Sequence, residues 1–177
     1  MRLGDGPAAG VLVVGYGNPL RSDDGVGPAV AEALAADPRL AGAEIRAEHQ
    51  LTPELALDAS RASLLVLVDA AEDLAPGAIE VRRIETGLAG RGFTQEAGPP
   101  LTHHMDPSGI LSLSRELFGA APSSVVLIGI GASVLEVGET LSPLVAATVP
   151  RVVELVAGLV VDHMAGVVLV PARAPEG

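Results

Sequence analysis

The chain has 177 residues, a formal net charge of -11 and no cysteine, and all 11 of its basic residues are arginine. This length favours a single domain that can bury a substantial core. The absence of cysteine excludes disulfides and thiolate chemistry, and the absence of lysine excludes a Schiff base. Because an acidic surface repels phosphate backbones, we expect no nucleic-acid partner.

Nothing in the sequence indicates a membrane-bound or a secreted protein. The best candidate for a membrane span, residues 152–170, is interrupted by Glu154, Asp162 and His163, which do not suit the centre of a bilayer. The first residues lack the architecture of a signal peptide. We therefore expect a cytoplasmic protein without a membrane partner.

The first half of the chain alternates between predicted strands and helices. Strands that are apolar throughout are typical of a sheet buried on both faces. Thr52 is expected to cap a helix that has Pro53 in its first turn. The predicted strands are 11–15, 43–47 and 63–68, and the predicted helices are 28–36 and 52–59.

The second half begins with an alternating segment, residues 78–84, which is typical of a half-exposed edge strand. Glycine and proline at 86–100 predict a long loop. Further along, the pattern predicts a helix from Asp106 or Pro107 to 118, a strand at 124–130, and one long helix opened by Ser142 and Pro143 and ending near 161.

Strands that alternate with helices predict an α/β fold, a three-layer sandwich. We expect a mostly parallel twisted sheet of about five strands with helices on both faces, formed by one domain over residues 1–170. Residues 171–177 are expected to be a disordered tail. Ligands of such sheets bind beyond the carboxyl ends of the strands, where Asp24 and Asp69, which follow two separate strands, can meet.

The groups that can carry chemistry are Asp23 and Asp24, Asp69, and the pair His103 and His104. Two carboxylates with an imidazole suit a borderline divalent metal such as nickel, zinc or cobalt. Three protein ligands also leave positions open for water or substrate. The G-x-G at residues 15–17 lacks the third glycine of a dinucleotide fingerprint and is a weak signal for nucleotide binding.

Structural roles are open for each of these residues. Either aspartate of the adjacent pair can cap the helix that follows, and Asp69 can be a turn residue. Either adjacent histidine can face solvent or cap a helix. The lone His49 and His163 are assigned to packing or to the surface.

Five segments, in order, resemble the hydrogenase maturation protease family over about residues 10–160. They are GYGNPLRSDDGVGPAV (15–30), HQLTPELA (49–56), LLVLVDA (64–70), THHMDPSGIL (102–111) and GASVLEVGETLSPLVAATVP (131–150). The family's endopeptidases trim the C-terminal extension from the large subunit of nickel–iron hydrogenases. Several motifs in the same order are more specific than any one of them.

The resemblance implies nickel ligands at Asp24, Asp69 and His103, with His104 as the fallback. It also implies that the nickel is supplied by the hydrogenase precursor and signals that the precursor is ready for cleavage, and other divalent metals such as zinc can stand in for it. The implied partner is the large-subunit precursor, and the implied state is a monomer. Asp24 or Asp69 can act as general base, or a metal can activate water. We further expect Asp23 to cap the helix while Asp24 faces the crevice.

Two other classes of function remain open from the sequence. A non-catalytic, metal-dependent chaperone for the hydrogenase large subunit would use the same three ligands. A small-molecule binder would use the crevice beside the G-x-G turn, and ligand binding would then stabilise the native state.

Overall fold

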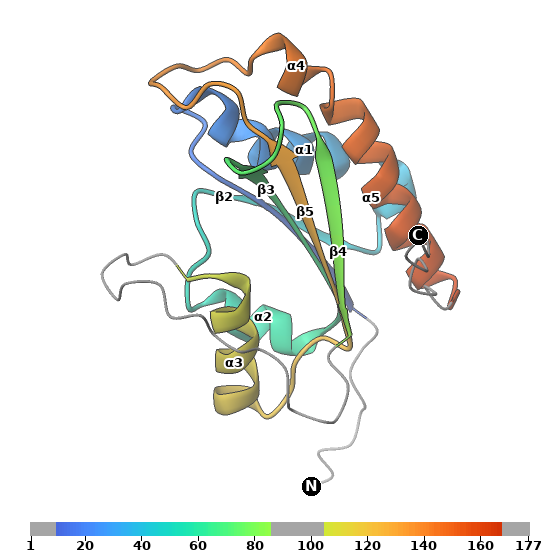
Figure 1. Cartoon of the computed structure of the whole chain (residues 1–177). Coiled ribbons are helices and arrows are strands. Elements are labelled where there is room, and N and C mark those ends of the chain that lie inside the picture. Colours follow the sequence, from blue (N-terminus) through green and yellow to red (C-terminus); the bar gives the residue numbers. More distant parts are fainter. Residues whose placement is uncertain (1–9, 86–104, 168–177) are drawn as a thin grey trace, which may run out of the picture.

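A computed structural model describes residues 10–85 and 105–167, which form a five-stranded sheet with helices on both faces (Figure 1). The strands are β1 (Gly10–Tyr16), β2 (Glu44–Glu48), β3 (Ala62–Ala71), β4 (Ile79–Glu85) and β5 (Ser124–Gly131). The helices are α1 (Val26–Ala35), α2 (Leu55–Arg61), α3 (Pro107–Phe118), α4 (Pro143–Ala146) and α5 (Val149–Met164), with short 3-10 turns η1 (Ser22–Gly25) and η2 (Pro38–Leu40). The predicted three-layer α/β fold is confirmed.

The strand order is β2-β1-β3-β5-β4, and the first four of these strands are parallel. Only β4 runs antiparallel, paired with β5 at the edge of the sheet, as its alternating sequence predicted. The parallel strands therefore all end at one edge of the sheet, and the loops that follow them gather there. We call this the carboxyl edge.

The strands are apolar on both faces because each face has its own core. Val11 and Val13 of β1 pack in the cluster formed with α1 and α5, whereas Leu12 and Val14 pack in the cluster formed with α2 and α3. Each fully buried aliphatic side chain contributes about 1.5–3 kcal/mol relative to exposure. The two cores together hold the sheet that positions the carboxyl edge.

Three predicted helix boundaries were wrong. The segment after Thr52 begins with a turn, the helix starts at Leu55, and Thr52 makes no cap. The helix predicted from residue 28 begins at Val26. The long helix predicted from Ser142 is two helices, because Pro150 has no N–H to continue the first one and instead sits in the first turn of α5.

Within the described residues, one stretch, Pro143–Met164, is long and apolar enough to cross a membrane, with a mean hydropathy of 2.0. The structure explains its composition differently. Val145, Val152, Val156 and Val160 are fully buried in the core between the sheet and the helices. In all, 39% of its most apolar window is buried, so the core accounts for part of its composition.

The start of α1 lies unusually close to the sheet. A Cβ on Gly27 would lie 2.3 Å from the Tyr16 carbonyl oxygen and 2.6 Å from the Val68 carbonyl oxygen. Only a residue without a side chain allows the helix to begin directly against the ends of β1 and β3. This contact brings the loop that carries Asp23 and Asp24 to the carboxyl edge.

We expect Gly27→Ala to lower the free energy of unfolding by about 3 kcal/mol, because the added methyl meets backbone atoms that have no room to move. Gly158→Ala in α5 is the control. A Cβ there meets nothing within 4 Å, and replacing glycine in a helix interior should stabilise by about 0.5–1 kcal/mol. Urea unfolding measures both. Equal effects of the two substitutions would contradict the close approach of α1.

Candidate functional site

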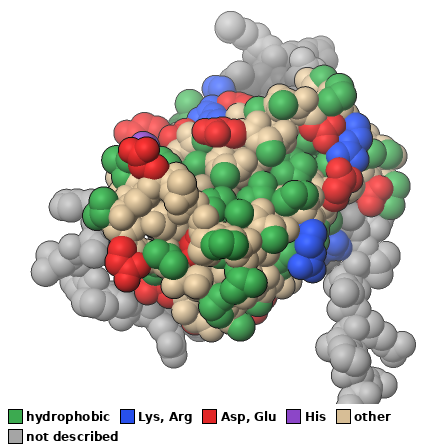
Figure 2. Space-filling model, turned by 90° about the horizontal axis from the view of Figure 1, so that it is seen from above, with side chains coloured by type: hydrophobic (Ala, Val, Ile, Leu, Met, Phe, Trp, Pro, Cys, Tyr) green, Lys and Arg blue, Asp and Glu red, His purple; other side chains and the backbone are tan. Residues whose placement is uncertain are grey.

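Two neighbouring cavities open at the carboxyl edge, with volumes of about 470 and 500 Å³. The first cavity is lined by Asp24, His49 and Asp69, among others. The second cavity runs on toward β4 and reaches Arg82. Tyr16, Asp69, Asp106 and Pro107 line both cavities. Figure 2 shows the molecule from above, from the side of the carboxyl edge. Acidic side chains lie around the margin of this surface, with hydrophobic side chains between them.

Asp24 is held in place by the turn that leaves β1. Gly17 has φ +140°, and a Cβ at this position would lie 1.9 Å from the Asp24 carbonyl oxygen. The Asn18 N–H donates to Asp24 Oδ2 at 3.0 Å, and Arg21 Nη1 lies 4.0 Å from the same oxygen. The side chain remains 24% exposed, so its free oxygen is accessible from the first cavity.

Asp69 lies inside β3, two residues before the strand ends, and is not a turn residue. Its Oδ1 accepts the Ala70 N–H at 2.8 Å. Partial burial raises the pKa of the Asp69 carboxyl to about 6, against the opposing hydrogen bonds from Tyr16 and Ala70, and the charge of Asp24 adds to the rise. A carboxyl with this pKa can bind a metal as carboxylate or accept a proton near neutral pH.

Tyr16 is a site residue that the sequence reasoning missed. It ends β1, in the register position next to the pair Gly15 and Val68, so it is the neighbour of Asp69 on the adjacent strand. Burial and the Asp69 carboxylate raise the pKa of its hydroxyl well above the usual range, so it stays protonated and donates a hydrogen bond to Asp69. The alternation Leu12, Val14, Tyr16 along β1 was the available signal.

Asp23 does not cap α1, contrary to the prediction. The cap position of that helix is Gly25, without a side-chain hydrogen bond. Instead, the buried Asp23 carboxylate accepts the backbone N–H groups of Ser133 and Val134, both at 2.8 Å. It also accepts the backbone N–H of Ser142 at 2.6 Å and the hydroxyl O–H of Ser142 at 2.8 Å. Burial alone would raise the pKa of Asp23, but these four hydrogen bonds together hold it below its ordinary value.

Backbone hydrogen bonds extend this clamp along the loop after β1. Ser22 N–H donates to the Gly138 carbonyl at 2.8 Å, Gly138 N–H donates to the Leu20 carbonyl at 3.0 Å, and Asp23 N–H donates to the Val134 carbonyl at 3.0 Å. Ser22 has a positive φ of 50°, a strained conformation that the surrounding contacts must stabilise. These hydrogen bonds therefore fix the loop after β1 to the loop after β5 at the carboxyl edge.

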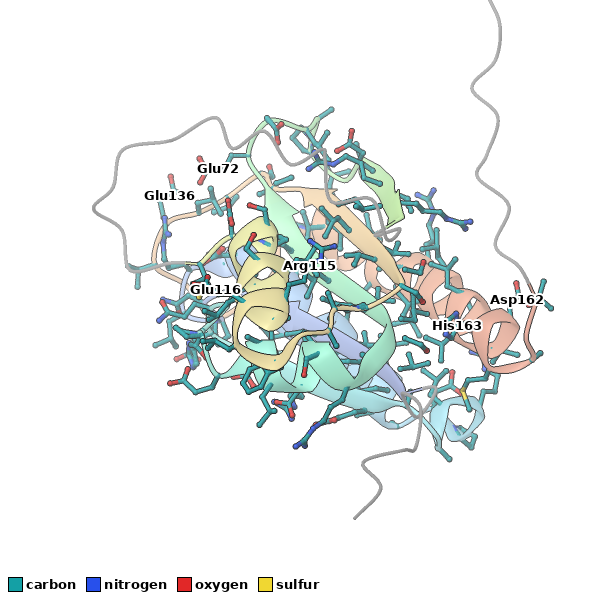
Figure 3. The ribbon with its side chains drawn as sticks, turned by 90° about the horizontal axis from the view of Figure 1, so that it is seen from below. Glu72, Arg115, Glu116, Glu136, Asp162 and His163 are labelled. Atoms are coloured by element: carbon teal, nitrogen blue, oxygen red, sulfur yellow. The ribbon has the colours of Figure 1, made fainter. Side chains whose placement is uncertain are left out.

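The two described histidines, His49 and His163, lie at opposite ends of the molecule. His103 and His104 lie outside the described residues, so their place at the site stays a prediction. His49 is exposed, as expected of a surface residue, but it follows β2 and lines the first cavity beside Asp24 and Asp69. His163 Nε2 lies 2.8 Å from the Ser63 hydroxyl, and Figure 3 shows it at the end of the molecule opposite Glu72 and Glu136.

Two of the three predicted metal ligands, Asp24 and Asp69, lie among the described residues. Among residues 10–85 and 105–167, no group of three histidine or carboxylate side chains is arranged to hold a metal ion. The carboxylates of Asp24 and Asp69 nevertheless provide oxygen donors that line the same cavity. This donor set is compatible with a divalent metal that brings some of its own ligands.

We expect Asp23→Ala to lower the free energy of unfolding by about 3 kcal/mol, because it leaves three backbone N–H groups of the loop after β5 without their acceptor. Asp106→Ala is the comparison. Asp106 caps α3 by accepting the Gly109 N–H at 2.7 Å, and losing such a cap costs about 1 kcal/mol. Equal losses in urea unfolding would show that Asp23 is only another cap.

We expect Asp69→Asn to stabilise the metal-free protein at pH 7.5 by roughly 2–3 kcal/mol. Folding raises the pKa of Asp69 from 3.8 to about 6, so the folded state holds a proton that the unfolded state loses between these pH values. The resulting penalty is complete above pH 6 and nearly absent below pH 4. The gain from Asp69→Asn should therefore shrink in urea unfolding at pH 4, whereas Glu32→Gln, on the exposed face of α1, should change nothing at either pH. If Asp69→Asn lowered the stability at both pH values, the charge of Asp69 would not be unfavourable in the folded protein.

Comparison with known proteins gives structural matches only, since no protein-family model and no curated protein matches the sequence. The hydrogenase maturating endopeptidase HybD from Escherichia coli superposes with a TM-score of 0.66 at 25% identity, over 89% of this chain and 94% of that one. The [NiFe] hydrogenase maturation protease HybD from Thermococcus kodakarensis gives 0.60 at 25% identity, over 85% and 99%. A hydrogenase 2 maturation peptidase from a member of the Thaumarchaeota gives 0.62 at 24% identity, over 89% and 99%. The chain therefore has the fold of the hydrogenase maturation endopeptidases, which confirms at the level of the fold the resemblance found in its sequence.

Proposed function

We propose that this protein is an endopeptidase that removes the C-terminal extension from the nickel-loaded large-subunit precursor of a nickel–iron hydrogenase. The observation that carries the proposal is that Asp24, in the turn η1 after β1, and Asp69, in β3, line the same open cavity of a chain with the maturation-endopeptidase fold. In this proposal the protein works in the cytoplasm, where the large subunit is made, and it works as a monomer, as its resemblance to the family implies.

Nickel belongs to the substrate in this proposal. Asp24, Asp69 and His103 contact the metal of the loaded precursor, so that only a precursor with nickel in place gains these contacts. The cavity supports the two carboxylate contacts, since the Asp24 side chain is partly exposed and Asp69 lines the same cavity. Zinc, or another divalent metal that prefers the same nitrogen and oxygen ligands, can take the place of nickel at the same residues.

The residues of this chain can also carry the hydrolysis. An Asp69 carboxylate oxygen that is not bound to the metal can take a proton from an attacking water. The water oxygen then bonds to the scissile carbonyl carbon, and the amide nitrogen leaves with a proton returned from Asp69. A divalent metal at the site, when present, can polarise the scissile carbonyl. This assigns an aspartic-type activity to a chain that has no cysteine.

The test is a cleavage assay with purified protein and hydrogenase precursor, loaded with nickel or free of it, read by intact-mass spectrometry. We expect loss of a C-terminal peptide only from the loaded precursor. Asp24→Asn and His103→Ala should reduce cleavage by at least about 100-fold. Asp24→Asn keeps an oxygen that can accept the Asn18 N–H, so its effect reports on the lost charge. Glu32→Gln, on the exposed face of α1, is the matched control and should cleave normally.

The outcome of the assay also distinguishes a peptidase from a non-catalytic chaperone. Binding of a cognate loaded precursor without any cleavage would contradict the peptidase and favour a metal-dependent chaperone. Cleavage that is the same with and without nickel would leave the peptidase standing but remove the metal from its recognition.

A further inference from the structure

We infer that an apolar patch beside the first cavity docks the folded body of the large-subunit precursor, whose matching surface is apolar and flanked by basic side chains. The apolar patch consists of Leu20, on the loop after β1, and of Val134 and Val137, on the loop after β5. This inference rests on the proposed function. It adds a second contact with the precursor, separate from the contact with nickel.

The three side chains of the apolar patch are exposed although they are large. Val137 is 92% exposed, Leu20 55% and Val134 36%. Arg21 and Gly138, which directly follow Leu20 and Val137, form a parallel β-bridge. The three side chains therefore stand on backbone segments that lie next to each other. Exposed apolar side chains that gather in one place, unlike scattered ones, are typical of an interaction surface.

The backbone of the apolar patch is held in one conformation before any partner binds. The Asp23 carboxylate accepts the Val134 N–H at 2.8 Å, and the Asp23 N–H donates to the Val134 carbonyl at 3.0 Å. The Gly138 N–H donates to the Leu20 carbonyl at 3.0 Å. A loop that is ordered in advance loses little conformational entropy on binding. The buried charge of Asp23, which has no part in the proposed hydrolysis, thus serves to preserve a docking surface.

Arg21 connects the apolar patch with the proposed site. It directly follows Leu20 and lines the first cavity, and its Nη1 lies 4.0 Å from Asp24 Oδ2. A precursor whose nickel reaches Asp24 therefore brings the surface around its metal over Leu20 as well. Because the apolar patch itself contains no metal-binding side chain, its contact with the precursor is the same with and without nickel.

The charges around the apolar patch decide which partner surface fits it. Glu136 and Glu139 lie on either side of Val137 in the sequence, and both are exposed. Glu72 and Glu136 line a further cavity of about 460 Å³, and Figure 3 shows them at the same end of the molecule. A second copy of this chain would bring the same carboxylates against each other. A partner surface with basic side chains around an apolar centre complements both the charges and the apolar side chains.

The first experiment measures the dissociation constant by calorimetry, with nickel-loaded and nickel-free precursor whose cut bond is blocked by proline. The double variant Leu20→Ser and Val137→Ser should raise the dissociation constant by at least about tenfold, and by the same factor for both forms of the precursor. Leu117→Ser is the matched control, since Leu117 is 62% exposed near the C-terminal end of α3, away from the carboxyl edge. Equal affinities of the double variant and the wild type would overturn the docking surface.

Cleavage kinetics separate docking from chemistry. With loaded precursor, Leu20→Ser and Val137→Ser together should raise KM by about tenfold and leave kcat within about twofold, because the docking contact is equally strong in the ground state and the transition state. Asp24→Asn should lower kcat instead. A double variant that lowers kcat as Asp24→Asn does, at an unchanged KM, would show that the patch acts in the chemistry and not in docking.

A second double variant, Glu136→Gln and Glu139→Gln, tests the charge of the partner surface. It should slow association by about threefold or more at low salt and weaken the salt dependence of the association rate, with little change in the dissociation rate. Surface plasmon resonance measures both rates. A wild-type association rate that does not fall as salt increases would contradict the basic side chains on the partner.

The proposed function and the docking surface fail separately. If the wild type binds the precursor without cutting it, the peptidase function is wrong, and the dissociation constants of the variants still decide the docking surface. If the wild type and the double variant Leu20→Ser and Val137→Ser bind and cut equally well, the peptidase function holds and the docking surface is wrong. A wild-type dimer in sedimentation that this double variant dissociates would assign the apolar patch to a second copy of the chain instead.

Discussion

The buried carboxylate of Asp23 is the contact on which the carboxyl edge depends. It gathers four hydrogen bonds from the loop after β5 and thereby fixes that loop to the loop after β1. A charge without solvent contact is costly unless it is fully hydrogen-bonded, and here its pKa lies below the ordinary value, which shows that the partners more than offset the burial. The adjacent Asp24 lines the first cavity.

Two neighbouring aspartates thus do different work because their surroundings differ. Asp23 is saturated with donors, whereas Asp24 accepts one backbone N–H and keeps a free oxygen. Asp69 is a third case, since burial raises its pKa and makes its charge unfavourable for the isolated protein. Such a carboxylate is poorly explained by stability and well explained by a ligand that offsets its cost.

The sequence predicted the parts of the fold that depend on patterns along the chain. The apolar runs and the alternation of 78–84 predicted the sheet and its edge strand, and Asp106 with Pro107 predicted the start of α3. What it missed depends on contacts between distant segments. The partners of Asp23 lie more than 100 residues away, and Tyr16 and His49 join the cavity only through the pairing of β1 with its two neighbours. The place of His103 stays a prediction, because it lies outside the described residues.

The proposed function requires that Asp24 and Asp69 contact the nickel of the loaded precursor. X-ray absorption at the nickel edge tests it directly, on a complex in which the cut bond is blocked by proline in the precursor. If Asp24 and Asp69 contact nickel, its oxygen and nitrogen neighbours increase when the protein binds, and the double variant Asp24→Asn and Asp69→Asn loses the oxygen part of this increase and keeps at most the nitrogen of His103. A nickel spectrum that is the same in the free precursor and in the bound complex would contradict it.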